Sequence, residues 1–381
     1  MRKITMIQYG CGKMSKLTMR YALEKGIKIV GAFDIDQSKL GIDIGEFLDM
    51  GKRLNVKIQD ATNLDEFLST HEVDVAIVTT TSLFSENYPI YEICAKNGVN
   101  VISTCEEAFY AQNSSPKLAK KLDKLAKESG VTICGSGYQD VFWGNLISVL
   151  GGATHKITTI RGKSSYNVED YGISLARVHG AGFSKNKFQK EIASLDNISE
   201  EERAKLIKEG KFAPSFMWNV NGWLCAKLGL HITHQTQKTV PQIAEEDLYS
   251  STLDMTIPKG HCTGMSAVVT TETKEGTTLI TECIGKVYSS KEFDCNDWTI
   301  EGEPNTRVVI ERPATAELTC ATVINRIPEV LVAEPGYTTT EQMPENIYKA
   351  HNIDKYLDIV ECCDEDCHCH DGNCHHDDCH C

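Results

Sequence analysis

Two kinds of segment alternate along the first 140 residues. Short runs that are almost continuously apolar predict buried strands, and longer segments with apolar residues every three or four positions predict amphipathic helices. The predicted strands cover residues 3–10, 27–34, 73–81, 99–104 and 131–137, and the predicted helices cover residues 15–26, 86–98 and 115–130. Near-continuous apolar strands separated by helices predict a parallel sheet that is covered on both faces.

The pattern changes at about residue 145. Longer strands with alternating apolar and polar positions are predicted at residues 155–168, 265–288 and 306–311, the second of these being a hairpin. A surface helix is predicted at residues 199–210, where Ser199 and Glu202 form a capping box, and another helix at residues 313–328. This texture predicts a second, α+β domain with a mixed or antiparallel sheet.

These patterns divide the chain into parts. We expect a first domain at residues 1–144 with a return segment at 335–358, a second domain at 145–334 for substrate binding and dimer formation, and a tail at 359–381. The length of 381 residues suits two domains, since single cores rarely grow beyond roughly 300 residues.

Composition excludes some classes of function. The net charge of −14 argues against a nucleic-acid surface, and no apolar run is long enough to span a bilayer. The N-terminal segment lacks the apolar region of a signal peptide, so we expect a cytoplasmic protein with no membrane partner. Nine of the sixteen cysteines are scattered singly, several within apolar runs, and indicate small buried residues rather than a disulfide framework.

A glycine-rich loop follows the first predicted strand and opens the first predicted helix. Gly10 permits a tight turn and Gly12 permits close approach of the backbone to a pyrophosphate at the helix N-terminus. Asp34 ends the second strand, where its carboxylate can accept hydrogen bonds from the adenosine ribose. These features predict a doubly wound Rossmann domain that binds NAD, or NADP if Asp34 turns aside for Lys39. The predicted cofactor-binding residues are Gly10, Cys11, Gly12, Lys13, Met14, Ser15, Asp34, Thr79, Thr80 and Thr81.

Two adjacent acids, Glu106 and Glu107, follow the strand at residues 99–104. Ligands of open parallel sheets bind beyond the carboxyl ends of the strands, so these acids are expected on the cofactor side. Removing hydride from a carbon that bears nitrogen leaves an iminium cation, which a carboxylate stabilises. The same carboxylate can take the proton of the amine and activate the attacking water, and partial burial would raise its pKa. A solvated loop is the alternative.

Four segments together carry a resemblance to a known family. The glycine loop and residues 103–110, 135–146 and 325–336 resemble 2,4-diaminopentanoate dehydrogenase and the native amine dehydrogenases, over roughly residues 1–357. The resemblance implies NAD(P)-dependent oxidative deamination of the 4-amino group of 2,4-diaminopentanoate to 2-amino-4-oxopentanoate and ammonia, a step of amino acid (ornithine) degradation. It also implies a homodimer.

The resemblance places the family's catalytic glutamate on Glu106, with Glu107 as the second choice, and its pocket residues on Gln139, Trp143 and Tyr171. His179 and His261 lie among glycines and are further candidates for contact with substrate. Arg161 and Arg177 are candidates for binding a substrate carboxylate, although surface ion pairs are the alternative for both.

The last twenty residues contain seven Cys, five His and six Asp or Glu. Thiolates and imidazoles at this density suit Zn, Ni or Cu, although hydride transfer from an amine requires no metal. The candidate ligands are Cys362, Cys363, Cys367, His368, Cys369, His370, Cys374, His375, His376, Cys379, His380 and Cys381. Two other functions stay open: a reductase or dehydrogenase of another small amine or imine, and a non-catalytic sensor of NADH or metal.

Overall fold

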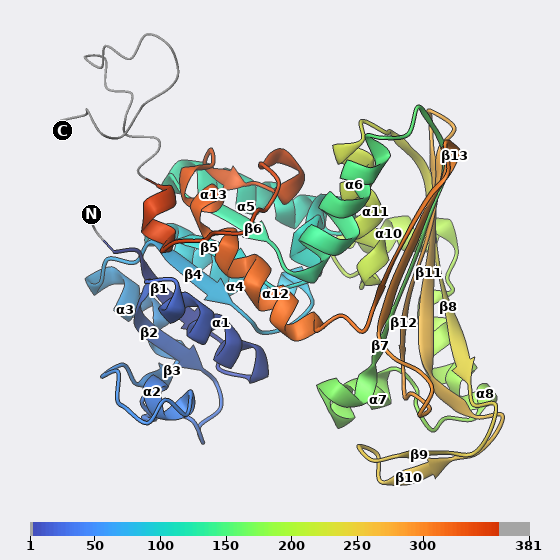
Figure 1. The fold of residues 1–381 in the computed structure, drawn as a ribbon, viewed down its shortest axis with the longest axis horizontal. Coiled ribbons are helices and arrows are strands. Elements are labelled where there is room, and N and C mark those ends of the chain that lie inside the picture. The colour runs from blue at the N-terminus through green and yellow to red at the C-terminus, as the bar shows by residue number, and fades with distance from the viewer. Residues whose placement is uncertain (1–2, 358–381) are drawn as a thin grey trace.

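The computed structural model describes residues 3–357, and its first sheet has seven strands, all parallel (Figure 1). Their order is β15-β6-β5-β4-β1-β2-β3. The strands are β1 (Thr5–Tyr9), β2 (Lys28–Asp34), β3 (Ile58–Asp60), β4 (Val75–Val78), β5 (Asn100–Ser103), β6 (Thr132–Gly135) and β15 (Gly336–Tyr337). The parallel sheet predicted from the sequence is therefore confirmed.

Helices cover both faces of this sheet because side chains on successive strand residues point to opposite faces. On one face, Ile7 and Val101 pack in a core with α3 (Leu64–Thr70), α4 (Phe84–Lys96) and α5 (Pro116–Ser129). On the other, Met6 and Ile102 pack with α1 (Lys13–Glu24), α12 (Thr315–Asn325) and α13 (Ile327–Val332). This is the doubly wound arrangement expected for a Rossmann domain.

The second sheet has six strands in the order β14-β13-β7-β12-β11-β8 and stands edge-on at the right of Figure 1. Only β7 and β12 pair in parallel, so the sheet is mixed. One of its faces packs against α11 (Phe216–Lys227) in a core that contains Trp223 and Trp298. The strands are β7 (Lys156–Asn167), β8 (Ile232–Ile243), β11 (Cys262–Thr273), β12 (Thr278–Lys286), β13 (Cys295–Glu303) and β14 (Thr306–Glu311).

Shorter elements complete the fold. The surface helix α10 (Glu200–Glu209) begins as predicted, with the Ser199 side chain accepting a hydrogen bond from the Glu202 N–H. The others are α2 (Ile44–Phe47), α6 (Leu146–Gly151), α7 (Ile173–Val178), α8 (Lys185–Phe188), α9 (Ser194–Asp196), β9 (Leu248–Ser250) and β10 (Met255–Ile257).

The helix predicted to stop near Pro328 differs in the structure. It ends at Asn325, and α13 begins at Ile327 with Pro328 in its first turn. Proline is tolerated in the first turn, where its missing N–H would have no partner in the helix, so here it starts a helix instead of ending one.

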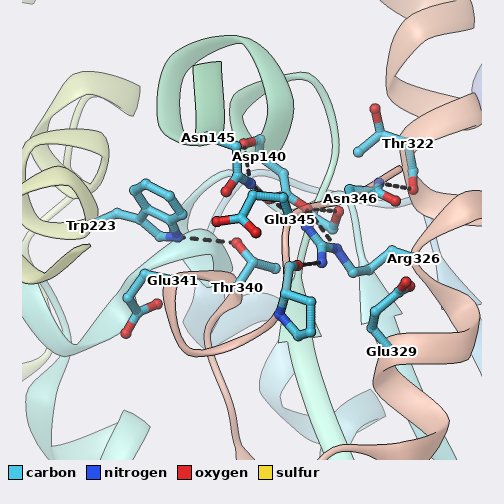
Figure 2. A network of polar contacts seen from close by, with 12 residues as sticks. Asp140, Asn145, Trp223, Thr322, Arg326, Glu329, Thr340, Glu341, Glu345 and Asn346 are labelled. Atoms are coloured by element: carbon cyan, nitrogen blue, oxygen red, sulfur yellow. Dashed lines mark hydrogen bonds and ion pairs between the residues drawn. The ribbon is translucent and has the colours of Figure 1, made fainter. Parts of the chain in front are cut away.

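The transition between the sheets is a π-helix, η4 (Gln139–Asn145), which follows β6 and leads into α6. A buried ion pair fixes it: the Arg326 guanidinium donates from Nε and Nη2 to the two Asp140 oxygens, both at 3.0 Å (Figure 2). Arg326 also donates to the Pro344 carbonyl, and Trp223 Nε1 donates to Thr340 Oγ1 at 3.0 Å. These contacts join the segment after α13 to α11 through Trp223 and, through Arg326, to the π-helix.

Within residues 3–357, no helix has the length and apolar character needed to cross a bilayer. The same residues contain no cluster of three or more side chains able to hold a metal ion. The candidate metal ligands at residues 362–381 lie outside the described residues.

Candidate active site

A cavity of about 600 Å³ lies where the carboxyl ends of the parallel strands face the second sheet. Its walls come from the segments after β4, β5 and β6, from β7, and from the start of α12. Residues far apart in sequence thus meet in one enclosed space, as expected for a ligand site at the carboxyl edge of an open α/β sheet.

The glycine loop joins β1 to α1 beside this cavity. Gly10 has φ +85°, and a Cβ there would lie 2.4 Å from the Thr79 carbonyl oxygen, so only glycine fits. At Gly12 a Cβ would meet open space, and no side chain caps the N-terminus of α1. The uncapped N–H groups and the open space beside them fit a bound pyrophosphate.

Asp34 holds the glycine loop against the end of β2. Its Oδ2 accepts from the Cys11 N–H at 2.7 Å and from Lys39 Nζ at 3.2 Å, while Oδ1 accepts from the Asp36 N–H at 2.8 Å. Burial by itself would raise the pKa of Asp34, but these donors together hold that pKa below its ordinary value. Lys39 places positive charge beside the carboxylate, so NAD and NADP both remain candidate cofactors.

The remaining residues of the predicted cofactor loop lie in two environments. Cys11 and Ser15 are buried, and Ser15 Oγ donates to the Gly12 carbonyl at 2.7 Å. Lys13 is exposed and donates from Nζ to the Asp170 carbonyl at 3.2 Å, and Met14 lines the cavity.

The three threonines after β4 all line the cavity. Thr79 Oγ1 donates to the Gly10 carbonyl at 3.0 Å, so this segment is fixed to the glycine loop. Asn87 on α4 holds the other two, since Thr80 donates to its side-chain oxygen and Asn87 Nδ2 donates to the Thr81 carbonyl at 2.9 Å. The threonine segment is therefore a rigid wall between the glycine loop and the cavity.

Glu106 is half-buried and lines the cavity, which makes it the only carboxylate among the described residues that do so. Burial raises the pKa of Glu106 above the ordinary glutamate value, although a hydrogen bond from Ser82 acts in the opposite direction. A carboxylate shifted in this direction is suited to act as a general base near neutral pH.

Glu107 does not line the cavity. It is 4% exposed, and its Oε2 accepts from the Phe84 N–H at 2.7 Å, at the start of α4. Its Oε1 accepts from the hydroxyls of Ser114 and Ser115, both at 2.7 Å. This carboxylate accepts hydrogen bonds from protein donors and does not line the cavity. Its position therefore does not support the second-choice assignment of Glu107 as the catalytic glutamate.

Aromatic and amide side chains line the same cavity as Glu106. Trp143 and Gln139 from the π-helix and Tyr171 from the segment after β7 line the cavity, as does Tyr138. Trp143 is fixed by its Nε1, which donates to Asn296 Oδ1 at 3.0 Å. Among the described residues, Tyr138 Oη and Gln139 Nε2 are buried with no hydrogen-bond partner. Buried polar atoms without partners are uncommon in proteins, and both belong to side chains of the cavity wall.

The two histidines suggested by the sequence have different positions. His179 is buried behind Tyr166, with its Nε2 2.7 Å from Tyr166 Oη, and reaches the cavity only through that residue. His261 does not line the cavity; its backbone carbonyl accepts from the Ala244 N–H at the start of β11. The position of His261 therefore contradicts contact with a ligand in this cavity.

Neither arginine suggested for carboxylate binding lies in the cavity wall. Arg161 donates from Nε to Glu301 Oε1 at 2.6 Å on the second sheet, which is the surface ion pair named as its alternative. Arg177 lines a separate groove. Arg161 lies on β7 and Arg177 on α7, and the sequence did not show toward which side each side chain would point.

Sequence reasoning missed several residues at this site. Tyr138 and Tyr166 line the cavity, and Asp140 anchors the π-helix to Arg326. The sequence contained a signal for the ion pair between Asp140 and Arg326. Each of these residues interrupts a mostly apolar segment, and a buried charge requires a partner of opposite charge.

Comparisons with known proteins agree over nearly the whole chain. A family model described as the 2,4-diaminopentanoate dehydrogenase C-terminal domain matches residues 142–357. The chain is 23% identical to 2,4-diaminopentanoate dehydrogenase from Acetoanaerobium sticklandii over 357 residues, which are 90% of this chain and 94% of that protein.

Among solved structures, amine dehydrogenase from Mycobacterium smegmatis is 34% identical with a TM-score of 0.80, and the match covers 92% of this chain and 98% of that one. A scyllo-inositol dehydrogenase from Lactobacillus casei, with bound NAD(H) and scyllo-inositol, has a TM-score of 0.53 at 14% identity, covering 90% and 94% of the two chains, and shares the fold alone.

Proposed function

Because the chain belongs to the family of the 2,4-diaminopentanoate dehydrogenase C-terminal domain and is an NAD(P)-dependent amine dehydrogenase, we propose that Glu106 is the base of an oxidative deamination. The observation that carries this proposal is a single half-buried carboxylate in a cavity beside the glycine loop. A non-catalytic sensor, the alternative, would not require a half-buried carboxylate in the wall of this cavity.

Glu106 would act at two stages. Its carboxylate first takes a proton from the ammonium form of the substrate, which frees the nitrogen lone pair, and passes that proton to solvent. The carboxylate is then negatively charged again and stabilises the iminium cation. The bound nicotinamide supplies the oxidising power by accepting the hydride. Glu106 next takes a proton from the water that adds to the iminium carbon and returns it to the nitrogen of the resulting carbinolamine. Glu106 then takes the hydroxyl proton as the C–N bond breaks, and the departing ammonia takes that proton up as ammonium. Overall, an ammonium substrate, NAD(P)⁺ and water give a ketone, ammonium, NAD(P)H and one proton.

The cofactor would be held by the residues already described. The uncapped start of α1 and the open space at Gly12 receive the pyrophosphate, and Thr79 keeps the loop in shape. Asp34 would position the adenosine ribose through the loop it fixes, with Lys39 near enough to tolerate a 2′-phosphate.

The family resemblance points to 2,4-diaminopentanoate, deaminated at its 4-amino group. One observation favours a second candidate class, amines that carry no carboxylate: the described residues of the cavity wall include no Lys, Arg or His. A substrate carboxylate in this cavity would lack a cation, and burial of an unpaired charge is costly. Simple primary amines therefore fit the charge of the cavity best.

The test is to follow the ultraviolet absorbance of NADH or NADPH with purified protein, using 2,4-diaminopentanoate, its decarboxylated analogue 1,3-diaminobutane, and simple secondary-carbon amines. We expect turnover of amines, with kcat/KM higher for the analogue without the carboxylate. A higher kcat/KM for 2,4-diaminopentanoate than for 1,3-diaminobutane would show that the diamino acid is the preferred substrate. If the protein oxidised none of these amines, the proposed function would be refuted. The homodimer and the cytoplasmic location remain predictions.

A further inference from the structure

Tyr166 lines the same cavity as Glu106, and the reaction described above gives it no role. It lies on β7, directly opposite Gly285 on β12. Its ring makes edge-to-face contacts with Tyr171, at 5.6 Å between ring centroids, and with His179, at 5.9 Å. The ring is therefore fixed from several sides, and the direction of its hydroxyl hydrogen bond can be worked out.

His179 determines that direction. Its Nδ1 lies 2.9 Å from the Leu175 carbonyl oxygen, which can only accept, so Nδ1 carries a proton. Its Nε2 lies 2.7 Å from Tyr166 Oη. In a neutral imidazole with the proton on Nδ1, Nε2 can only accept, and the Tyr166 hydroxyl must donate to it.

The neutral form of His179 is the one its surroundings favour. The ring is 6% exposed, and burial lowers the pKa of His179 below its ordinary value, with the hydrogen bond to Leu175 acting in the opposite direction. Burial, together with the nearby Cys283 and Glu106, raises the pKa of Tyr166 well above that of a free tyrosine, so its hydroxyl keeps the proton that it donates.

We propose that Tyr166 and His179 make the cavity selective for substrates with a nitrogen group over substrates with an oxygen group. The Tyr166 hydroxyl donates its hydrogen bond to His179, so the Tyr166 oxygen is left as an acceptor for substrate N–H groups. This inference rests on the proposed function. Tyr166 would contact the substrate, and His179 is a positioning residue that acts through it.

The selectivity follows from counting protons. An ammonium group has three N–H donors and an iminium group has two, so each can donate to Glu106 and to Tyr166 at the same time. An alcohol has one O–H and can satisfy only one of the two acceptors. A ketone has none, and its oxygen would face two acceptors. The pair would therefore favour amine oxidation, and in the reverse direction it would favour imine reduction over reduction of the free ketone.

Gly285 is the residue that permits this arrangement. A Cβ at position 285 would lie 2.5 Å from His179 Cδ2 and 2.7 Å from both His179 Nε2 and Tyr166 Cζ. Any larger residue would push the two rings apart, which gives a third position at which the pair can be disturbed without changing either polar side chain.

The first measurement is the tautomer of His179 by NMR of protein labelled with ¹⁵N-histidine. The chain has twelve histidines, so the signals of His179 are assigned by their loss in His179→Asn. We expect a neutral ring with the proton on Nδ1 at about pH 7. A proton on Nε2 would overturn the inference whatever the activity of the enzyme. This holds both for the neutral ring with its proton on Nε2 and for the ring with a proton on each nitrogen.

The second measurement compares sec-butylamine as substrate with 2-butanol as an alternative substrate or competitive inhibitor. In Tyr166→Phe we expect the KM of the amine to rise roughly 10- to 100-fold, the value of one hydrogen bond to a charged group, with the inhibition constant of the alcohol almost unchanged. In His179→Leu, Tyr166 is free to donate into the cavity, so the alcohol should bind more tightly and the amine less tightly.

Equal changes for the amine and the alcohol in Tyr166→Phe would overturn the inference while the proposed function stands. Turnover of no amine by the unmodified protein would instead refute the proposed function. Gly285→Ala serves as the third variant and should lower the preference for the amine in the same direction as Tyr166→Phe, because it displaces the same ring. An unchanged preference in Gly285→Ala would count against the inference.

Discussion

The neighbouring carboxylates of Glu106 and Glu107 have opposite environments. Glu106 lines the cavity, and Glu107 accepts three hydrogen bonds of 2.7 Å from Phe84, Ser114 and Ser115 on the other side of the chain. Glu106 is the N-cap of a short helical turn, η2 (Glu107–Phe109), and Glu107 is its first residue. The pair therefore offers two similar substitutions with different expected consequences, one for chemistry and one for stability.

Glu107→Gln should destabilise the fold and leave the chemistry of the folded protein in place. The amide has no charge and only one acceptor oxygen, so part of the network at the start of α4 is lost, at about 1–3 kcal/mol. Urea denaturation measures the change, and turnover per folded molecule is the control. Loss of turnover with unchanged stability would show that Glu107 has a chemical role.

Glu106→Gln should change stability in the opposite direction, and the change should depend on pH. Burial raises the pKa of Glu106 in the folded protein above its unfolded value, so the stability linked to its proton is full at low pH and is lost as the pH rises through the folded pKa. The variant should therefore unfold at a higher temperature than the unmodified protein at about pH 8, with the difference disappearing below about pH 4. Thermal unfolding across this range tests it, and a variant that is less stable at high pH would contradict it.

Gly10→Ala should weaken cofactor binding roughly tenfold or more, because a Cβ would approach the Thr79 carbonyl oxygen at 2.4 Å in a left-handed backbone conformation. Gly41→Ala is the matched control: Gly41 has φ +83°, close to the +85° of Gly10, but a Cβ there would meet nothing within 4 Å. Titration of NADH fluorescence should show weaker binding in the first variant only. If NADH bound equally weakly to both variants, the loss would come from strain of a left-handed backbone residue and not from the shape of the glycine loop.

Arg326→Met should cost about 3–5 kcal/mol of unfolding free energy, since it leaves Asp140 charged and buried without its partner (Figure 2). The double variant with Asp140→Leu should recover most of this loss, because two apolar side chains need no charge compensation. Urea denaturation of the single and double variants measures both effects. A single variant as stable as the unmodified protein would contradict the role given to this pair.

Much of the first domain was predictable because its strands are buried on both faces and its helices on one. Residues 27–34, for example, predicted a strand that the structure places at Lys28–Asp34. The glycine loop was found by its position between strand and helix. Both acids were expected on the cofactor side, with Glu106 preferred through the family resemblance. The strand and helix pattern alone could not establish which acid faces the cavity.

Several other elements were not predictable in the same way. Helix α11 is buried almost all round, as shown by Trp218, Val220 and Trp223, so it has no polar face to reveal a helical period. The π-helix and the contact between Asp140 and Arg326, 186 residues apart in sequence, arise from tertiary packing alone. Tyr166 could not be distinguished from other strand residues without knowing the face on which it lies.

The proposed role of the Glu106 carboxylate is to carry out proton transfer and to stabilise the cation during amine oxidation. The most direct test is the rate of NAD(P)H formation by Glu106→Gln at a saturating concentration of the best amine, with the dissociation constant of NAD(P)H measured on the same sample. We expect a fall in kcat of roughly 10²- to 10⁴-fold with cofactor affinity nearly unchanged. A variant that keeps most of its turnover while it binds the cofactor normally would contradict it.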